Sequence, residues 1–239
     1  MGTRTARGFG QYGGVARALE RVGERWALLI VRDLLSGARR YSDLKAGLPR
    51  IPTNILSDRL KELQESGVIR RVPTIRGGYE LTPLGRELEP VVLALERWGW
   101  AALGDPREDE VLTGDALAVA LRAAFRAEAA AVLPPTEYVL NVGDAAVSAI
   151  VADGRLDVVP IGPGAVPQPA RREPPGAPAP DLLELSIPAA GLHALLSGDP
   201  RSADALVGDD ALLQRFRTTF AVDPHPVASA DASPDSSAA

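Results

Sequence analysis

The fold is decided by residues 41–82, which run YSDLKAGLPRIPTNILSDRLKELQESGVIRRVPTIRGGYELT. A short helix is expected over 42–48, where two leucines lie four positions apart. Pro49 and Pro52 follow it at once. Proline lacks a backbone N–H and pushes the preceding residue out of the α region, so the chain must turn tightly here.

A second, longer helix is expected over 53–66. Leucines recur there at i, i+4 and i+7 and form a single apolar face, made by Leu56, Leu60 and Leu63. Gly67 then suits the left-handed position that ends such a helix. The stretch therefore begins with two helices joined by a tight turn.

A β-hairpin is expected directly after these helices. Two short strand-like runs cover 68–72 and 79–81, and the Gly77-Gly78 pair permits the turn between them. Arg76 lies near the tip of this hairpin. The whole arrangement predicts a helix-turn-helix followed by a β-wing, which makes DNA the first partner to consider. The alternative is a winged helix used only for protein contact.

The physical chemistry of DNA recognition assigns roles to the polar residues. Short polar side chains in the first turns of the longer helix can contact base edges in the major groove, and Lys61 can reach a phosphate. Arg76 can enter the minor groove, where the negative potential is strong. For Arg59 a structural ion pair and a phosphate contact stay open. The candidate DNA-binding residues are Arg40, Ser42, Thr53, Asn54, Ser57, Arg59, Lys61 and Arg76.

Charge is divided unevenly along the chain, although its overall formal charge is −5. Residues 1–100 hold 17 of the 26 Lys and Arg but 11 of the 31 Asp and Glu, a net charge of +6. Residues 101–239 carry a net charge of −11. Because phosphate neutralisation needs local positive charge, the basic half is the one expected to bind double-stranded DNA.

Several function classes are disfavoured by composition. The chain has no cysteine, so disulfides, thiolate metal sites and thiol redox sensing are excluded. The two histidines lie on unrelated segments, and no phosphate loop or nucleophile motif is present. No apolar run approaches the ~20 residues of a membrane span. We therefore expect a cytoplasmic protein that is not an enzyme, with no catalytic residues, no metal, no cofactor and no membrane partner.

Helical patterns flank the helix-turn-helix on both sides. Two helices are expected before it, over 15–22 and 24–35, and Thr82-Pro83 is a start signal for a helix running to about Leu103. Such a helix often supplies a dimer interface, and a homodimer would place two recognition helices on a palindromic operator. The tryptophans at positions 26 and 98 are expected to pack in the core, and Trp100 to line a dimer or domain interface.

These motifs together resemble the HxlR-type winged-helix regulators of bacteria, over about residues 12–100. The motifs that carry the resemblance are VARAL at 15–19, RWALLI at 25–30, RRYSDL at 39–44, ILSDRLKEL at 55–63 and YELTPLG at 79–85. The resemblance implies a dimeric transcription regulator related to the MarR group, with its recognition helix at 53–65 and its wing at 69–81. Many members carry a sensing cysteine just before the first motif, where this chain has Gly13-Gly14. It must sense something else, or nothing.

The second half predicts a mixed sheet-and-helix unit. An alanine-rich helix is expected over 115–133, followed by strands at 137–142, 146–152 and 155–159, with Asp153-Gly154 as a two-residue hairpin turn. Residues 161–180 are rich in Pro, Gly and Ala and are expected to form a long loop. A strand over 182–187 and a helix over 211–220 follow, and the tail from 223 has the composition of a disordered segment.

This order of elements resembles the sterol carrier protein type two fold over about residues 110–222. The runs that carry the resemblance are AIVADG at 149–154, LELSIPAAGLHALLSG at 183–198 and VGDDALLQRF at 207–216. It implies an apolar tunnel that holds a hydrophobic small molecule. Candidate ligand-binding residues are Phe125, Tyr138, Phe216 and Phe220, although plain core packing is the commoner role for such rings.

The sequence thus predicts an α+β protein with a winged-helix unit and a sterol-carrier-like unit. The expected divisions are a flexible N-terminus at 1–11, the winged helix at 12–104, a linker at 105–114, the ligand or dimerisation unit at 115–222 and a disordered tail at 223–239. We expect a homodimeric DNA-binding regulator controlled by a small apolar ligand. The alternatives are a constitutive DNA binder whose second unit serves only dimerisation or partner contact, and a lipid carrier with a vestigial winged helix.

Overall fold

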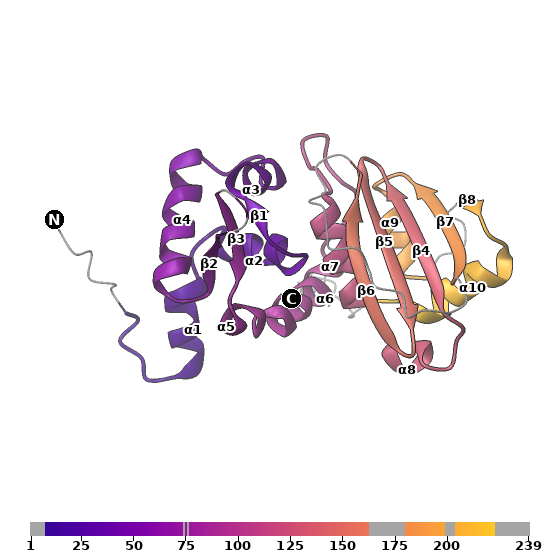
Figure 1. The fold of residues 1–239 in the computed structure, drawn as a ribbon, viewed down its shortest axis with the longest axis horizontal. Coiled ribbons are helices and arrows are strands. Elements are labelled where there is room, and N and C mark those ends of the chain that lie inside the picture. Colours follow the sequence, from indigo (N-terminus) through magenta and orange to yellow (C-terminus); the bar gives the residue numbers. More distant parts are fainter. Residues whose placement is uncertain (1–7, 74, 76, 163–179, 199–203, 223–239) are drawn as a thin grey trace, which may run out of the picture.

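The computed structural model describes residues 8–73, 75, 77–162, 180–198 and 204–222. Two units lie side by side, each built around its own sheet (Figure 1). We call residues 14–100 the N-terminal unit and residues 114–222 the C-terminal unit. The mixture of helix and sheet agrees with the α+β class expected from the sequence. Residues 223–239, where a disordered tail is predicted, lie outside the described part of the chain.

The N-terminal unit surrounds a small antiparallel sheet of order β1-β3-β2 with helices. Its elements are α1 (Gly14–Val22), α2 (Ala27–Leu35), β1 (Arg39–Arg40), α3 (Tyr41–Gly47), α4 (Thr53–Glu65), β2 (Ile69–Val72), β3 (Gly78–Leu81), α5 (Pro83–Arg86) and α6 (Glu89–Trp100). The helix-turn-helix and the wing are therefore confirmed. Gly67 ends α4 with a φ of 74°, the left-handed conformation expected there. The two-residue strand β1 was not predicted.

The predicted continuous helix from Thr82 to Leu103 is wrong, because the chain forms α5 and α6 with a break between them. The start signal itself is confirmed, since the Thr82 hydroxyl accepts a hydrogen bond from the Gly85 N–H at 3.1 Å. Pro90 explains the break: it has no N–H, and its ring would clash with the carbonyl four residues earlier in a continuous helix. Pro90 instead occupies the first turn of α6, where it is tolerated.

Trp98 was expected in the core, but 77% of its surface is exposed. It lies on the same face of α6 as Val91 and Leu95, at i, i+4 and i+7, and these side chains are exposed as well. Trp100, two positions further, is buried and stacks on His193 of the C-terminal unit with ring centroids 5.4 Å apart. Trp100 thus lies at the contact between the units.

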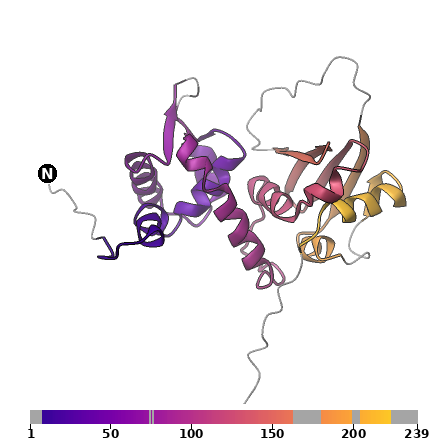
Figure 2. The ribbon, with the colours of Figure 1, turned by 90° about the horizontal axis from the view of Figure 1, so that it is seen from below.

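The C-terminal unit is a five-stranded sheet of order β6-β5-β4-β7-β8, with its helices on one face (Figures 1 and 2). Only the central pair β4–β7 is parallel. The elements are α7 (Gly114–Ala124), α8 (Ala127–Ala130), β4 (Thr136–Val142), β5 (Ala145–Ala152), β6 (Arg155–Ile161), β7 (Asp181–Ile187), α9 (Gly191–Leu196), β8 (Asp204–Val207) and α10 (Asp210–Thr219). The hairpin turn at Asp153-Gly154 is confirmed, with φ values of 52° and 68°.

The predicted helix over 115–133 is wrong in one respect, since it is divided at Phe125 into α7 and α8. The backbone of Phe125 is extended and forms an isolated antiparallel bridge with Phe220. The Arg126 N–H donates to the Thr219 carbonyl, and the Ala221 N–H donates to the Ala124 carbonyl, both at 2.9 Å. These long-range hydrogen bonds replace helical ones. Strand β8 was also unpredicted.

Helix α7 joins the two units by packing against both α2 and α6. Val119 of α7 is fully buried in the hydrophobic core of the N-terminal unit. Arg39 forms a two-bonded ion pair with Asp115, from Nη2 to Oδ1 at 2.5 Å and from Nε to Oδ2 at 3.2 Å. These buried contacts fix how the units are placed.

No helix in the described ranges is long and apolar enough to cross a membrane.

Candidate DNA-binding surface

Helix α4 presents one face to the core and the opposite face to solvent. Its leucines at 56, 60 and 63 are buried, which anchors the helix on the N-terminal unit. Thr53, Asn54, Ser57 and Lys61, four of the predicted site residues, are exposed. An exposed polar face on the second helix of a helix-turn-helix is what major-groove recognition requires.

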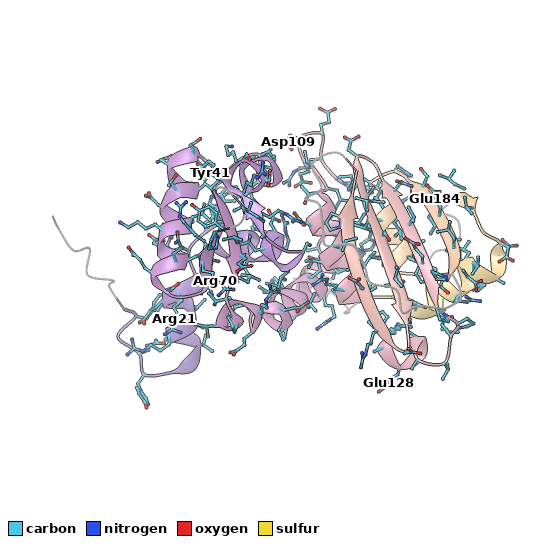
Figure 3. All side chains as sticks on the ribbon, viewed as in Figure 1. Arg21, Tyr41, Arg70, Asp109, Glu128 and Glu184 are labelled. Atoms are coloured by element: carbon cyan, nitrogen blue, oxygen red, sulfur yellow. The ribbon has the colours of Figure 1, made fainter. Side chains whose placement is uncertain are left out.

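Tyr41 holds the start of α4 in place and was missed by the sequence reasoning (Figure 3). Its hydroxyl donates to the Thr53 carbonyl at 2.9 Å and lies 3.4 Å from the Ser57 hydroxyl. The Ser57 hydroxyl also donates to the Thr53 carbonyl, at 3.1 Å. Tyr41 is the first residue of α3, so this contact ties the start of α3 to the first turn of α4. Ser57 shares its hydroxyl with this network and is therefore positioned before any DNA arrives.

Arg59 and Lys61 lie in different surroundings, although both belong to α4. The Arg59 side chain is only 12% exposed and forms ion pairs with Glu62 and, at 3.4 Å, with Glu24. This geometry favours the structural ion pair over the phosphate contact. Lys61 is exposed, and its ammonium lies 3.8 Å from the Glu65 carboxylate. Since exposed pairs of this kind are weak, Lys61 can exchange its partner for a phosphate.

The two candidates before α4 lie at the start of α3. Arg40 is exposed, and its backbone N–H donates to the Asp43 carboxylate at 2.8 Å, which caps the helix. The Ser42 hydroxyl is exposed and donates to the other oxygen of Asp43 at 3.3 Å. Arg76, the predicted wing-tip contact, lies outside the described residues.

The structure adds three basic residues that the sequence reasoning did not select. Arg50 lies in the turn just before α4 and forms an exposed ion pair with Asp109 of the segment between the units. Arg70 and Arg71 are exposed on wing strand β2. The Arg71 guanidinium lies over the Tyr79 ring, 4.9 Å from its centroid. The doubled arginine at positions 70 and 71 was the signal available in the sequence.

The predicted ligand-binding aromatics come together in the core of the C-terminal unit. Tyr138, Phe216 and Phe220 are fully buried, with ring centroids 5.0 to 5.5 Å apart. The Phe125 ring lies 5.9 Å from that of Phe220. Burial raises the pKa of the Tyr138 hydroxyl, which lies 3.5 Å from the Thr219 hydroxyl. These rings fill space with one another, and ligand contact stays a prediction.

A buried polar cluster lies where α2 packs against α7. The Asp33 Oδ1 accepts two hydrogen bonds from Arg32, at 2.7 and 2.8 Å, whereas its Oδ2 has no hydrogen-bond partner among the described residues. Desolvation, opposed by Arg32 and reinforced by Asp115, raises the pKa of Asp33 to about 6. Within the same described ranges, no group of three or more acidic or histidine side chains is arranged to hold a metal.

Comparisons with known proteins place the N-terminal unit in a family. Residues 21–106 match the family model described as HxlR-like helix-turn-helix. The chain is 38% identical over 86 residues to the HTH-type transcriptional regulator YvaP of Bacillus subtilis, covering 34% of this chain and 80% of that protein. It is 46% identical over 89 residues to the regulator Rv3095 of Mycobacterium tuberculosis, covering 36% of this chain and 56% of the relative.

Solved structures that overlap the chain belong to similar proteins. The crystal structure of the HTH-type regulator ytcD is 35% identical, covers 37% of this chain and 94% of its own, and has a TM-score of 0.35. The structure of the redox regulator HypR in its oxidised form is 28% identical, and the overlap covers 36% of this chain and 94% of the HypR chain, with a TM-score of 0.34. From the sequence matches, this chain belongs to the HxlR-like helix-turn-helix family of bacterial transcriptional regulators.

Proposed function

We propose that this regulator binds a palindromic operator as a homodimer and that a small apolar molecule controls it. The exposed polar face of α4 is the observation that carries the DNA-binding part. Asn54, in its first turn, is assigned to base edges, and Lys61, one to two turns further along, to a phosphate. Arg40 and Arg50 flank the start of α3 and of α4 and extend the phosphate-binding surface.

The dimer interface is assigned to exposed apolar side chains of the N-terminal unit. Leu84 of α5 and the stripe formed by Val91, Leu95 and Trp98 on α6 are exposed. Val15 of α1 is exposed as well. The three side chains on α6 follow one another at i, i+4 and i+7 and form a contiguous exposed apolar stripe, which is uncommon on a monomer and characteristic of protein interfaces. A second copy of this chain would cover it and would place two α4 helices on successive major grooves.

Control by an apolar ligand is assigned to the C-terminal unit, which we propose to be a sterol-carrier-like domain. The strand order with one parallel pair and helices confined to one face supports the sequence resemblance. The second candidate is a constitutive DNA binder whose C-terminal unit serves only dimerisation or partner contact. The packed aromatic cluster favours this alternative, since a ligand there would have to displace ring contacts.

DNA recognition is tested by recovering genomic fragments bound by the purified protein and titrating one of them by fluorescence anisotropy. Asn54→Ala should weaken binding to the recovered site by about 1–3 kcal/mol and leave the affinity for random DNA unchanged. Lys61→Ala should weaken binding to the recovered site and to random DNA equally. It should also lower the slope of log affinity against log salt concentration by about one. Arg155→Ala, which removes an exposed charge from the C-terminal unit, is the matched control. If Asn54→Ala and Lys61→Ala behaved identically on the two DNAs, the assignment of α4 would be wrong.

A further inference from the structure

A groove of about 610 Å³ lies between the two units, and we call it the interdomain groove. One wall of the groove is formed by the N-terminal unit, through Trp26, Leu29 and the turn at 47–50. The C-terminal unit contributes Leu192 and His193 of α9. The segment 102–112 that joins the units forms the remaining wall. Pockets for small molecules generally have volumes of about 300–1,000 Å³ and occur preferentially between domains. The groove is therefore suited to a small molecule, whereas a protein partner needs a broad surface of ~800 Å².

The walls of the groove carry unusually exposed apolar side chains. Leu29 and Leu103 are exposed, and Val111 is 64% exposed. Leu48 and Leu192 lie deeper and are buried. A bound apolar molecule would remove this surface from water, which is favourable in proportion to the area covered.

Trp26 gives a second, independent observation at the same place. Its backbone lies in the left-handed region with a φ of 81°, which is rare for a bulky residue. Such a conformation costs about 1–3 kcal/mol and is found mainly at ligand-binding and active sites. It directs an aromatic ring to the wall of the groove, where Arg25 covers it at 5.2 Å from the ring centroid.

The cationic side chains of the groove are already paired, whereas Asp105, which also lines it, is exposed to solvent and has no ion-pair partner among the described residues. Arg50 pairs with Asp109, and Arg107 pairs with Glu110. Arg32, also in the groove wall, pairs with Asp33. No lining cation therefore requires an anionic ligand.

His193 is a polar side chain in the deeper part of the groove, next to the buried Leu192, that remains available. It stacks on Trp100, but in the described part of the chain neither of its ring nitrogens has a hydrogen-bond partner. Its imidazole can donate or accept one hydrogen bond. A ligand with one polar group at this end and apolar surface elsewhere would complement the site.

We infer that the interdomain groove binds a small, uncharged and largely apolar molecule that carries one hydrogen-bonding group for His193. Its regulatory meaning rests on the ligand control proposed above, with the ligand site placed between the two units instead of within the core of the C-terminal unit. Leu48, Pro49 and Arg50 line the groove, and α4 begins three residues after Arg50. A ligand that binds better when this turn and the 102–112 segment are in one arrangement shifts α4 toward that arrangement.

The test titrates the full-length protein with N-phenyl-1-naphthylamine, a neutral fluorescent probe, and measures energy transfer from tryptophan. One saturable site per chain is expected. Val111→Asp should weaken binding about tenfold or more, because it places a charge in the apolar wall. Val132→Asp is the matched control, since Val132 is 85% exposed and lies outside the groove. It should leave binding unchanged.

Three outcomes would overturn the proposal. The parent protein could show no saturable binding of the neutral probe, or Val111→Asp and Val132→Asp could lose probe binding equally. The third outcome is that Phe220→Leu loses probe binding while Val111→Asp keeps it. The last would place the site in the aromatic cluster. Stronger binding of the anionic probe 1-anilinonaphthalene-8-sulfonate than of the neutral probe would overturn the inferred ligand class. Because these measurements contain no DNA, their failure is distinguishable from failure of operator binding, which the Asn54 and Lys61 variants report.

Discussion

Replacing Asp33 by asparagine should change how the stability of this protein depends on pH. Asp33 is almost completely buried, and its Oδ2 has no hydrogen-bond partner within the described residues. Burial raises its pKa from 3.8 to about 6 in the folded state. As pH rises from about 4, the unfolded chain loses this proton first. Folding stability from Asp33 is therefore present at low pH and lost as pH rises through about 6.

The size of the effect follows from the two pKa values. Each pKa unit corresponds to about 1.4 kcal/mol, so the separation between 3.8 and about 6 is worth roughly 3 kcal/mol in total. Between pH 4 and pH 7.5 about 2–3 kcal/mol of this should be lost. The asparagine of Asp33→Asn cannot titrate. The free energy of unfolding of this variant should therefore rise by about 2–3 kcal/mol relative to that of the parent between pH 4 and pH 7.5. Any constant cost of the buried amide is the same at both pH values and cancels.

Urea denaturation of the parent and of Asp33→Asn at pH 4 and pH 7.5 measures this difference. Glu128→Gln is the control, since it makes the same chemical change on an exposed side chain (Figure 3). The free energy of unfolding of the control should equal that of the parent at both pH values. A free-energy difference between parent and Asp33→Asn that is the same at pH 4 and pH 7.5 would refute the reasoning, because Asp33 would then not be held protonated by burial.

Three further predictions concern the contacts of the N-terminal unit. Asp109→Asn should strengthen DNA binding up to about fivefold in anisotropy titrations, since an exposed ion pair is worth at most about 1 kcal/mol, and the gain should vanish in an Arg50→Ala background. Trp98→Glu should shift sedimentation velocity from dimer to monomer, and an unchanged dimer would remove α6 from the interface. Asp115→Asn should lower the free energy of unfolding by about 3 kcal/mol, because it leaves the buried Arg39 charge without its partner.

Local sequence patterns were sufficient for the helix-turn-helix and for most strands. The tight turn at Pro49 and Pro52, the helix end at Gly67 and the hairpin at Asp153-Gly154 all depend on the conformations that these residues themselves allow. The structure follows each of them. The exposed side of α4 was predictable for the same reason, since helical periodicity places Asn54 and Lys61 away from the leucine face.

Long-range contacts account for the elements that were not predicted. Strand β8 is formed through its hydrogen bonds with β7. Phe125 interrupts the predicted helix because its backbone pairs with that of Phe220. Arg59 was ambiguous because one of its two ion-pair partners, Glu24, is 35 positions away in the sequence. Trp98 was expected in the core because periodicity identifies an apolar face and cannot tell whether that face meets its own chain or another.

Helix α7 shows why the two units are expected to communicate. It was predicted as an amphipathic helix, yet most of its residues are buried, because Leu117 and Leu121 belong to the core of the C-terminal unit while Val119 belongs to the core of the N-terminal unit. The two charged side chains of α7 are paired with the N-terminal unit as well, Asp115 with Arg39 and Arg122 with Glu89, so the helix is held by both units. Its alanines allow α2 and α6 to approach closely. Because protein interiors are tightly packed, a ligand that moves either unit must repack this shared helix, and the other unit follows.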